Sequence, residues 1–292
     1  LPMTEKFIEH IIVEKRYSAH TITSYRKDLA DFQHFYLETE GSENYLQADK
    51  KIIRNFIAYL GEKKLAKRTI NRKLSTLRSF YLFLLKIGEI KATPMENIST
   101  LKFYPEIQIP FSRDEMANLQ LLLSDSEQFF EMLIIETLYQ TGMRKAELCN
   151  LLYQDVNLKG NEMKVTGKGN KQRIIPFSDE LKQHLEFYAV QRKPLKDNEK
   201  WFFLHPKGKK LGEKFVYSIV NKYLSLVTSK KKKSPHILRH SFATHVLENG
   251  AEISKVKKIM GHSSLASTQM YTHANIEKLK KVFGEAHPRA KK

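Results

Sequence analysis

Apolar residues recur every three or four positions through the first third of the chain, and this spacing is the feature that most limits its fold. It places apolar side chains on one face of an α-helix, so each segment needs a partner for that face. Turn-forming or polar stretches separate the segments, and we therefore predict four helices packed as a bundle. The apolar positions are Phe7, Ile8, Ile11 and Ile12; Ile22, Tyr25, Leu29 and Phe32; Ile53, Phe56, Ile57 and Leu60; and Ile70, Leu74, Leu77, Tyr81 and Leu84.

The helical spacing stops between Ala92 and Pro110, where prolines recur and no period is visible. Ser112 followed three residues later by Glu115 is typical of a capping box, so a new helix is expected to start there. We therefore predict a linker at this point, with an N-terminal helical domain over residues 1–104 and a second domain over residues 105–292.

The second domain contains one short region with β character among helical segments. Residues 155–158, 163–166 and 172–176 have the alternation and β-branched content of strands, and the glycine-containing turn 167–170 joins the last two. The predicted fold class is therefore mainly α with a small antiparallel β-sheet: an N-terminal four-helix domain followed by an α+β domain.

The charge balance favours a polyanionic partner. Fifty Lys and Arg residues face 32 Asp and Glu residues, which gives a formal net charge of +18, and both domains are basic. Nucleic acid is the expected partner, through electrostatic attraction and counterion release, although solubility alone is the alternative explanation. The fourth helical segment carries basic residues away from its apolar stripe, which predicts either a helix that enters a DNA groove or a solvated face. These residues are Lys67, Arg68, Arg72, Lys73 and Arg78.

Several classes of protein are disfavoured by the sequence. The single cysteine, Cys149, cannot form an internal disulfide, and the chain has no Cys-x-x-Cys or His-Glu-x-x-His zinc motif. No run approaches the roughly 18 apolar residues of a membrane span, and the first residues carry charge where a signal peptide is apolar. We expect a cytoplasmic protein with no metal, no cofactor and no membrane partner.

Four short motifs stand out in the second domain. They are Thr141-Gly142-Met143-Arg144-Lys145-Ala146-Glu147-Leu148; Lys168; His236-Ile237-Leu238-Arg239-His240-Ser241-Phe242-Ala243-Thr244-His245; and Gly261-His262-Ser263-Ser264 followed by Tyr271-Thr272-His273. Their order and spacing resemble the tyrosine recombinase, or phage integrase, family. The N-terminal bundle and the ending Ala286-His287-Pro288-Arg289-Ala290 resemble in particular the bacterial Xer recombinases, which resolve chromosome dimers.

The resemblance implies a reaction that breaks a phosphodiester without a metal. Tyr271 would attack the scissile phosphate and hold the strand as a 3′-phosphotyrosine, which conserves the bond energy and makes ATP unnecessary. Arg144 and Arg239 match the two arginines of the family. A guanidinium group suits their task, because it is permanently charged and donates two parallel hydrogen bonds to phosphate oxygens.

The remaining catalytic positions follow from the same resemblance. Lys168 matches the hairpin lysine that protonates the leaving 5′-oxygen, with Lys164 and Lys171 as nearby rivals. His236 matches the histidine that assists removal of the tyrosine proton and binds the phosphate. His262 matches a second histidine, which we expect to position groups more than to transfer protons.

Other polar residues of the motifs have supporting roles in this interpretation. Glu147 lies three residues beyond Arg144 and is expected to orient that arginine. His240 and His245 follow Arg239 on a helix and are expected to pack or to support neighbouring groups.

The resemblance also implies partners. The two domains would encircle double-stranded DNA, with residues 1–104 as a SAM-like core-binding domain, and four subunits, identical or of two kinds, would assemble on two sites. A C-terminal apolar stripe would dock into a neighbouring subunit, or alternatively cover its own domain. A DNA translocase is a further expected activator. The stripe is Ile276, Leu279, Val282 and Phe283.

Site-specific recombination, with chromosome dimer resolution at a replication-terminus site, is therefore the predicted function. An integrase or invertase of a mobile element would use the same chemistry and is the first alternative. A DNA-binding protein without catalytic activity is the second, and the six filled reactive positions disfavour it.

Overall fold

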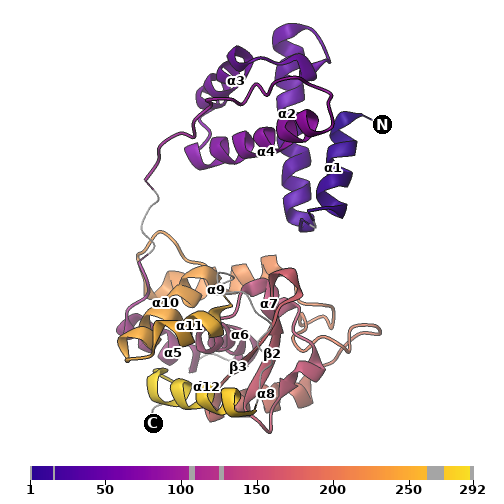
Figure 1. Cartoon of the computed structure of the whole chain (residues 1–292). Coiled ribbons are helices and arrows are strands. Elements are labelled where there is room, and N and C mark those ends of the chain that lie inside the picture. The colour runs from indigo at the N-terminus through magenta and orange to yellow at the C-terminus, as the bar shows by residue number, and fades with distance from the viewer. Residues whose placement is uncertain (1, 16, 105–108, 125–127, 262–272, 290–292) are drawn as a thin grey trace. The chain divides into compact units, whose positions relative to one another are not determined.

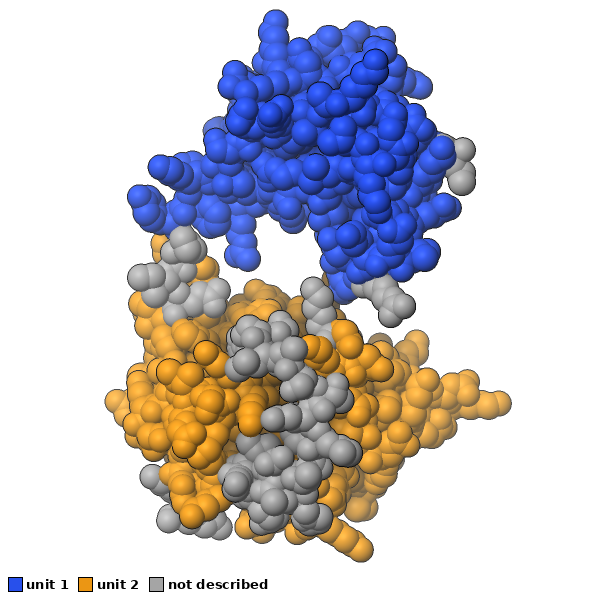
Figure 2. All heavy atoms as spheres, viewed as in Figure 1, with its two compact units in different colours: residues 1–106 blue, residues 107–292 orange. Residues whose placement is uncertain are grey.

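The computed structural model describes residues 2–15, 17–104, 109–124, 128–261 and 273–289. The chain divides into two compact units, unit 1 over residues 1–106 and unit 2 over residues 107–292 (Figures 1 and 2). Each unit has its own hydrophobic core. Within the described ranges, no helix combines the length and the apolarity that crossing a membrane requires.

Unit 1 is built from four α-helices, as the apolar spacing predicts. Ser18 and Asp49 cap the second and third helices by accepting hydrogen bonds from backbone N–H groups three residues ahead, and Gly41 ends the second helix with a φ of 63°. Aromatic rings from all four helices fill the core, including Phe7, Phe32 and Phe56. The elements are α1 (Met3–Val13), α2 (Ala19–Glu40), the 3-10 turn η1 (Tyr45–Gln47), α3 (Lys50–Glu62) and α4 (Lys67–Lys86).

Unit 2 is mainly helical and carries the small sheet. The predicted capping box is present, because Ser112 N–H donates to Glu115 and Glu115 N–H donates to the Ser112 hydroxyl. The helices are α5 (Arg113–Ser124), α6 (Phe129–Thr141), α7 (Lys145–Cys149), α8 (Asp179–Gln191), α9 (Glu213–Val227), α10 (Pro235–Glu248), α11 (Ile253–Met260) and α12 (His273–Ala286). The remaining elements are η2 (Tyr153–Asp155), β1 (Val156–Asn157), β2 (Glu162–Thr166), η3 (Lys168–Asn170) and β3 (Gln172–Pro176).

The three strands form one antiparallel sheet in the order β1-β2-β3, which confirms the predicted fold class. In the β2–β3 hairpin, Thr166 pairs with Gln172 and Val165 with Arg173, so the turn begins at Gly167. Gly169 has a φ of 72°, a conformation that favours glycine. The turn therefore presents Lys168 at the tip of the hairpin.

Helix α6 forms the centre of unit 2 and fixes the position of the motif that follows it. It is buried along most of its length and packs against α5, α8, α9 and α10. It ends at Gly142, whose φ of 58° turns the chain toward Arg144. A Cβ atom added to Gly142 would lie 2.4 Å from the Phe242 ring of α10. This close approach brings the first and third motifs together.

The C-terminal helix α12 packs on its own unit. It contacts β3 and α10, and Val282, Phe283 and Ala286 are buried. The residues after it continue this attachment: His287 is fully buried, and Arg289 forms an ion pair with Glu136 of α6 at 3.0 Å. The side chains of Ile276 and Leu279 lie outside the described part of the chain. In the single chain, the buried part of the predicted stripe thus covers its own unit.

Candidate active site

The corner between α6 and α7 holds the first predicted arginine. Arg144 precedes the first residue of α7, and its backbone N–H donates to Glu147 Oε2 at 2.7 Å. The Arg144 guanidinium also donates from Nη1 to Glu147 Oε1 at 2.9 Å, with 37% of the side chain exposed. Among the described residues, Glu147 alone accepts a hydrogen bond from this side chain. This geometry fits the predicted role of Glu147.

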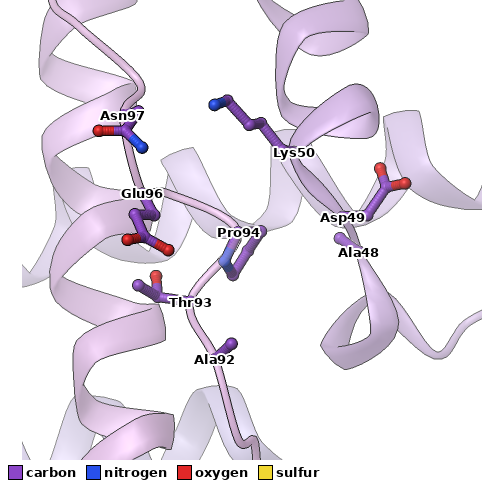
Figure 3. Close-up of a pocket in the computed structure, with 8 residues that line it drawn as sticks. All are labelled: Ala48, Asp49, Lys50, Ala92, Thr93, Pro94, Glu96 and Asn97. Atoms are coloured by element: carbon purple, nitrogen blue, oxygen red, sulfur yellow. The ribbon is translucent and has the colours of Figure 1, made fainter.

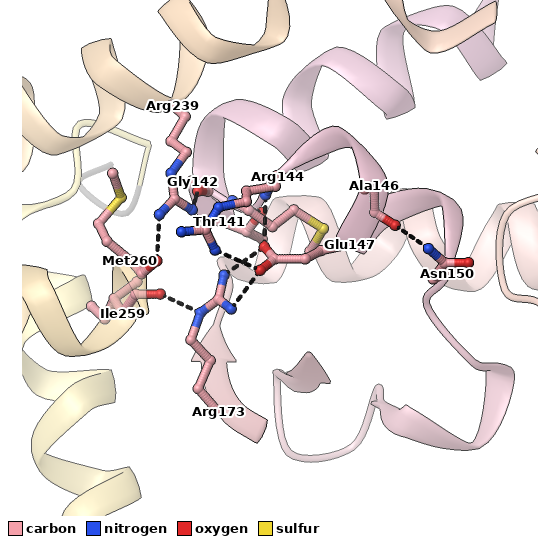
Figure 4. A network of polar contacts seen from close by, with 11 residues as sticks. Thr141, Gly142, Arg144, Ala146, Glu147, Asn150, Arg173, Arg239, Ile259 and Met260 are labelled. Carbon is pink, nitrogen blue, oxygen red and sulfur yellow. Dashed lines mark hydrogen bonds and ion pairs between the residues drawn. The ribbon is translucent and has the colours of Figure 1, made fainter. Parts of the chain in front are cut away.

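Glu147 is itself buried and held by a third arginine, Arg173 of β3. The two side chains form a bidentate pair, with Nη1 to Oε1 at 2.9 Å and Nη2 to Oε2 at 2.7 Å (Figure 4). Burial alone raises the pKa of Glu147, but the hydrogen bonds and charge of Arg173, together with the bonds from Arg144, outweigh it. The pKa therefore lies below its ordinary value, and the carboxylate stays ionised.

Arg239 reaches the same place from α10. Its guanidinium is buried and donates to the backbone carbonyls of Gly142 and Met260, at the ends of α6 and α11 (Figure 4). Burial lowers the pKa of Arg239 to about 10, and the charges of Arg144 and Arg173 act in the same direction. The group remains charged at neutral pH. Arg144 and Arg173 bind the Glu147 carboxylate, and Arg239 lies close enough for its charge to interact with all three groups, which leaves an excess of positive charge.

His236 lies one turn before Arg239, in the first turn of α10. The side chain is exposed in part, but its partial burial lowers its pKa, and the positive charges of Lys145, Arg239 and Arg144 lower it further. A neutral imidazole is therefore the dominant form at pH 7, and a neutral imidazole can accept a proton.

The other two histidines of this motif differ in burial. His245 is buried, and its ring nitrogens bond the Tyr139 hydroxyl and the Phe111 carbonyl, each at 2.8 Å. His240 is exposed. The packing role predicted for this pair therefore matches the surroundings of His245.

The hairpin places the backbone of Lys168 at its tip, while the Lys168 side chain lies outside the described part of the structure. Gly167 sits against the arginine cluster: an added Cβ atom would lie 3.2 Å from Glu147 Oε1. Of the two rival lysines, Lys164 forms an ion pair with Asp155 at 2.8 Å, whereas Lys171 is exposed.

Two predicted residues, His262 and Tyr271, lie outside the described residues. The described chain leads up to them: α11 ends at Met260, and Gly261 follows with a φ of 64°. The structure therefore brings Arg144, Glu147 and Arg239 close together and places His236 beside them.

Arg173 was not predicted from the sequence. Its signal is its position in the strand, because Arg173 lies two residues before Ile175 and therefore on the same face of β3 as that buried apolar residue. An arginine at an inward-facing strand position needs a buried anionic partner. The sequence does not say which carboxylate supplies it.

The basic face predicted for α4 needs one correction. Lys73 is buried and forms ion pairs with Asp28, at 3.1 Å, and with Asp31. Asp28 is fully buried and also accepts hydrogen bonds from Arg72 and Thr76. Lys73 therefore stabilises the contact between α2 and α4, because a buried carboxylate needs compensating donors.

The other four basic residues of α4 differ in their contacts. Arg72 is partly exposed despite its bond to Asp28. Lys67 and Arg78 donate to backbone carbonyls of the following segment, and Arg68 is exposed. All four carry charge outside the core of the bundle.

Two hollows occur on the surface of the described residues. One, of about 320 Å³, lies in unit 1 between residues 48–50 and 92–97 (Figure 3). Its polar groups serve the fold: Asp49 caps α3, and the Thr93 hydroxyl accepts the N–H of Met95. The other, of about 360 Å³, lies in unit 2 beside Glu147, Asp155 and Trp201. None of the predicted reactive residues lines either hollow.

Comparison with known proteins identifies the family. The phage integrase family matches residues 111–278, and the N-terminal SAM-like domain of phage integrases matches residues 4–88. The chain belongs to the phage integrase family. The family match in unit 2 spans Arg144, Glu147, Arg173, His236 and Arg239, so the arginine cluster lies inside the region that defines it.

Individual phage integrase relatives are similar over nearly the whole chain. The tyrosine recombinase XerC of Staphylococcus haemolyticus is 36% identical, covering 98% of this chain and 97% of the relative. The tyrosine recombinase XerC of Chlorobaculum tepidum is 34% identical, covering 98% of this chain and 94% of the relative. The crystal structure of XerH site-specific recombinase bound to palindromic difH substrate has a TM-score of 0.71 at 18% identity. It covers 92% of this chain and 77% of that chain, and this likeness concerns the fold.

Proposed function

We propose that this phage integrase family member is a site-specific DNA recombinase that cuts and rejoins strands through a covalent 3′-phosphotyrosyl link. The observation that carries the proposal is that Arg144, which binds Glu147, and Arg239 lie close together. Arg144 precedes α7 and Arg239 lies on α10, and together they place positive charge beside a neutral histidine. A phosphate is the group that such a cluster suits best.

The arginine pair would act on the transition state. Nucleophilic attack on a phosphodiester adds negative charge to the non-bridging oxygens, and preorganised donors stabilise that charge without reorganising. Arg144 is held by Glu147 and is partly exposed, and Arg239 is fixed by the carbonyls of Gly142 and Met260. Fixed cations of this kind favour the transition state over the ground state.

The remaining steps use the residues predicted from the sequence. The Tyr271 oxygen forms a bond to phosphorus as its proton leaves toward His236, and the bond from phosphorus to the 5′-oxygen breaks. Lys168 gives a proton to that 5′-oxygen, while His262 helps to position the phosphate. A 5′-hydroxyl from a second strand reverses the steps and completes the exchange. No cofactor takes part in this scheme.

We propose further that both units bind duplex DNA. Residues 1–104 would form the core-binding domain, and Lys67, Arg68, Arg72 and Arg78 of α4 would contact the DNA. This assignment is supported by the net charge of +18 and by the position of these four residues outside the bundle core. Lys73 is left out because it is buried.

Assembly as a tetramer on two sites, with half the subunits active at a time, is part of the proposal. For this assembly, α12 would leave its place against β3 and α10 of its own unit and dock into a neighbouring subunit. The biological role would be the resolution of chromosome dimers. Mapping binding sites across the genome tests this role: a single site near the replication terminus supports it, whereas sites at the ends of mobile elements favour an integrase.

Trapping on nicked suicide DNA tests the chemistry directly. The purified chain should form an adduct that survives SDS, also in EDTA, and Tyr271→Phe should abolish the adduct while DNA binding persists. Tyr217→Phe is the matched control, because Tyr217 is an exposed tyrosine on α9. An adduct that persists in Tyr271→Phe, or strand cleavage that never yields an adduct, would refute the proposal.

A further inference from the structure

Arg173 uses all three nitrogens of its guanidinium within the protein. Nη1 and Nη2 donate to the two carboxylate oxygens of Glu147, and Nε donates to the carbonyl of Ile259 at 2.6 Å. The side chain is 5% exposed. One buried guanidinium thus joins three elements: strand β3, helix α7 and the last turn of α11.

The charge of Glu147 is shared between two arginines. Its oxygens accept from both Arg173 and Arg144, and its position beside Arg144 is fixed further by the N–H bond that starts α7. A buried carboxylate with a single cationic partner holds that partner strongly, because little water is present to screen the pair. Without Arg173, Arg144 would be the one described cationic side chain still hydrogen-bonded to Glu147.

Two glycines pack closely against the Arg173–Glu147 pair. Gly167, at the base of the hairpin, approaches Glu147 so closely that an added Cβ atom would lie 3.2 Å from Oε1. Gly261, after α11, approaches Arg173 so closely that an added Cβ atom would lie 3.1 Å from Nη1. Two glycines that precede predicted reactive residues in the chain therefore pack against the Arg173–Glu147 pair.

We propose that Arg173 is a positioning residue for strand cleavage. It compensates the negative charge of Glu147, so that Glu147 orients Arg144 without drawing the Arg144 guanidinium away from the phosphate. The inference rests on the proposed recombinase function. It assigns Arg173 no contact with DNA. Arg173 acts through Glu147 and Arg144, and its effect therefore depends on the negative charge at position 147.

Single-turnover cleavage of nicked suicide DNA by Arg173→Met, Glu147→Gln and the double variant tests this dependence. In Arg173→Met the unopposed Glu147 draws Arg144 inward, and we expect adduct formation to slow by about 10- to 100-fold, the range for residues that support a reactive group. Adding Glu147→Gln should restore most of the rate, because glutamine still accepts the Arg144 N–H but carries no charge. Affinity for a single DNA site should stay within about two-fold throughout.

Arg192→Met is the matched control. Arg192 also lies in unit 2 and donates to backbone carbonyls, those of Glu199 and Trp201, but it does not contact the cluster. A wild-type rate in Arg173→Met, or a double variant as slow as the single one, would overturn the inference. If Arg173→Met does not fold, Arg173→Lys is the test, because lysine keeps the positive charge. A cleavage rate within a few-fold of wild type supports the inference, and a loss of rate as large as that of Arg144→Ala overturns it. Absence of any adduct with the wild-type chain would instead refute the proposed function.

Discussion

Replacing His287 with phenylalanine should make unit 2 less sensitive to acid. The His287 ring is fully buried and packs against Phe283, with 4.7 Å between ring centres, and against Tyr139 and Phe242. Burial lowers its pKa from 6.5 to about 3, and the charges of Arg289 and His245 act in the same direction. The folded chain therefore keeps this imidazole neutral at pH values where the unfolded chain protonates it.

The sign and the size of the effect follow from proton linkage. The stability that the neutral imidazole allows is fully present above pH 6.5 and is lost as the pH falls. Below pH 6.5 the unfolded state binds a proton at His287, whereas the folded state does not bind it until about pH 3. Each pH unit in this window costs about 1.4 kcal/mol, so the step from pH 7 to pH 5 removes about 2 kcal/mol of the free energy of unfolding. Phenylalanine preserves the aromatic packing and cannot take up the proton.

Urea unfolding at pH 7 and pH 5, followed by tryptophan fluorescence, measures this difference. Trp201 is the single tryptophan of the chain and lies in unit 2, so its signal reports on that unit. Wild type should lose about 2 kcal/mol more than His287→Phe between the two pH values. His240→Phe, at an exposed position of α10, serves as the control and should behave as wild type. Equal losses in wild type and His287→Phe would refute the reasoning.

Three further outcomes are expected. Lys73→Met leaves Asp28 undercompensated and should destabilise unit 1 by about 3 kcal/mol, seen as faster amide exchange in α2 and α4; adding Asp28→Asn should recover part of this, and unchanged exchange would contradict it. Lys145→Ala removes a positive charge that lowers the pKa of His236, so the acid limb of the pH profile of the cleavage rate should move to higher pH. An acid limb that does not move would argue against His236 as the proton acceptor. Gly142→Ala should destabilise unit 2 by about 2 kcal/mol, because a Cβ atom would meet a ring of α10 at a φ of 58°; an unchanged urea midpoint would show that the corner adapts.

Local patterns predicted most of the fold. The three- and four-residue spacing predicted α1 to α4, and the glycine-containing turn between β-rich segments predicted the β2–β3 hairpin, because helices and hairpins depend mainly on neighbouring residues. The same pattern misplaced Lys73. A residue beside an apolar stripe lies at the boundary of the buried face, and its burial depends on whether another helix offers a carboxylate, as Asp28 does here.

The candidate site, too, was predicted in part from local sequence and in part depends on the tertiary structure. The sequence by itself predicted that Arg144 and Glu147 lie in contact, since residues three apart at the start of a helix are neighbours, and it supplied the motifs that resemble the family. Only the tertiary structure decided that Arg173 belongs with them, because its partners Glu147 and Ile259 lie 26 and 86 residues away in the chain. The physical reason is that a buried charge is stabilised by whichever opposite charge the fold brings within hydrogen-bond distance, and separation along the chain does not reveal that distance.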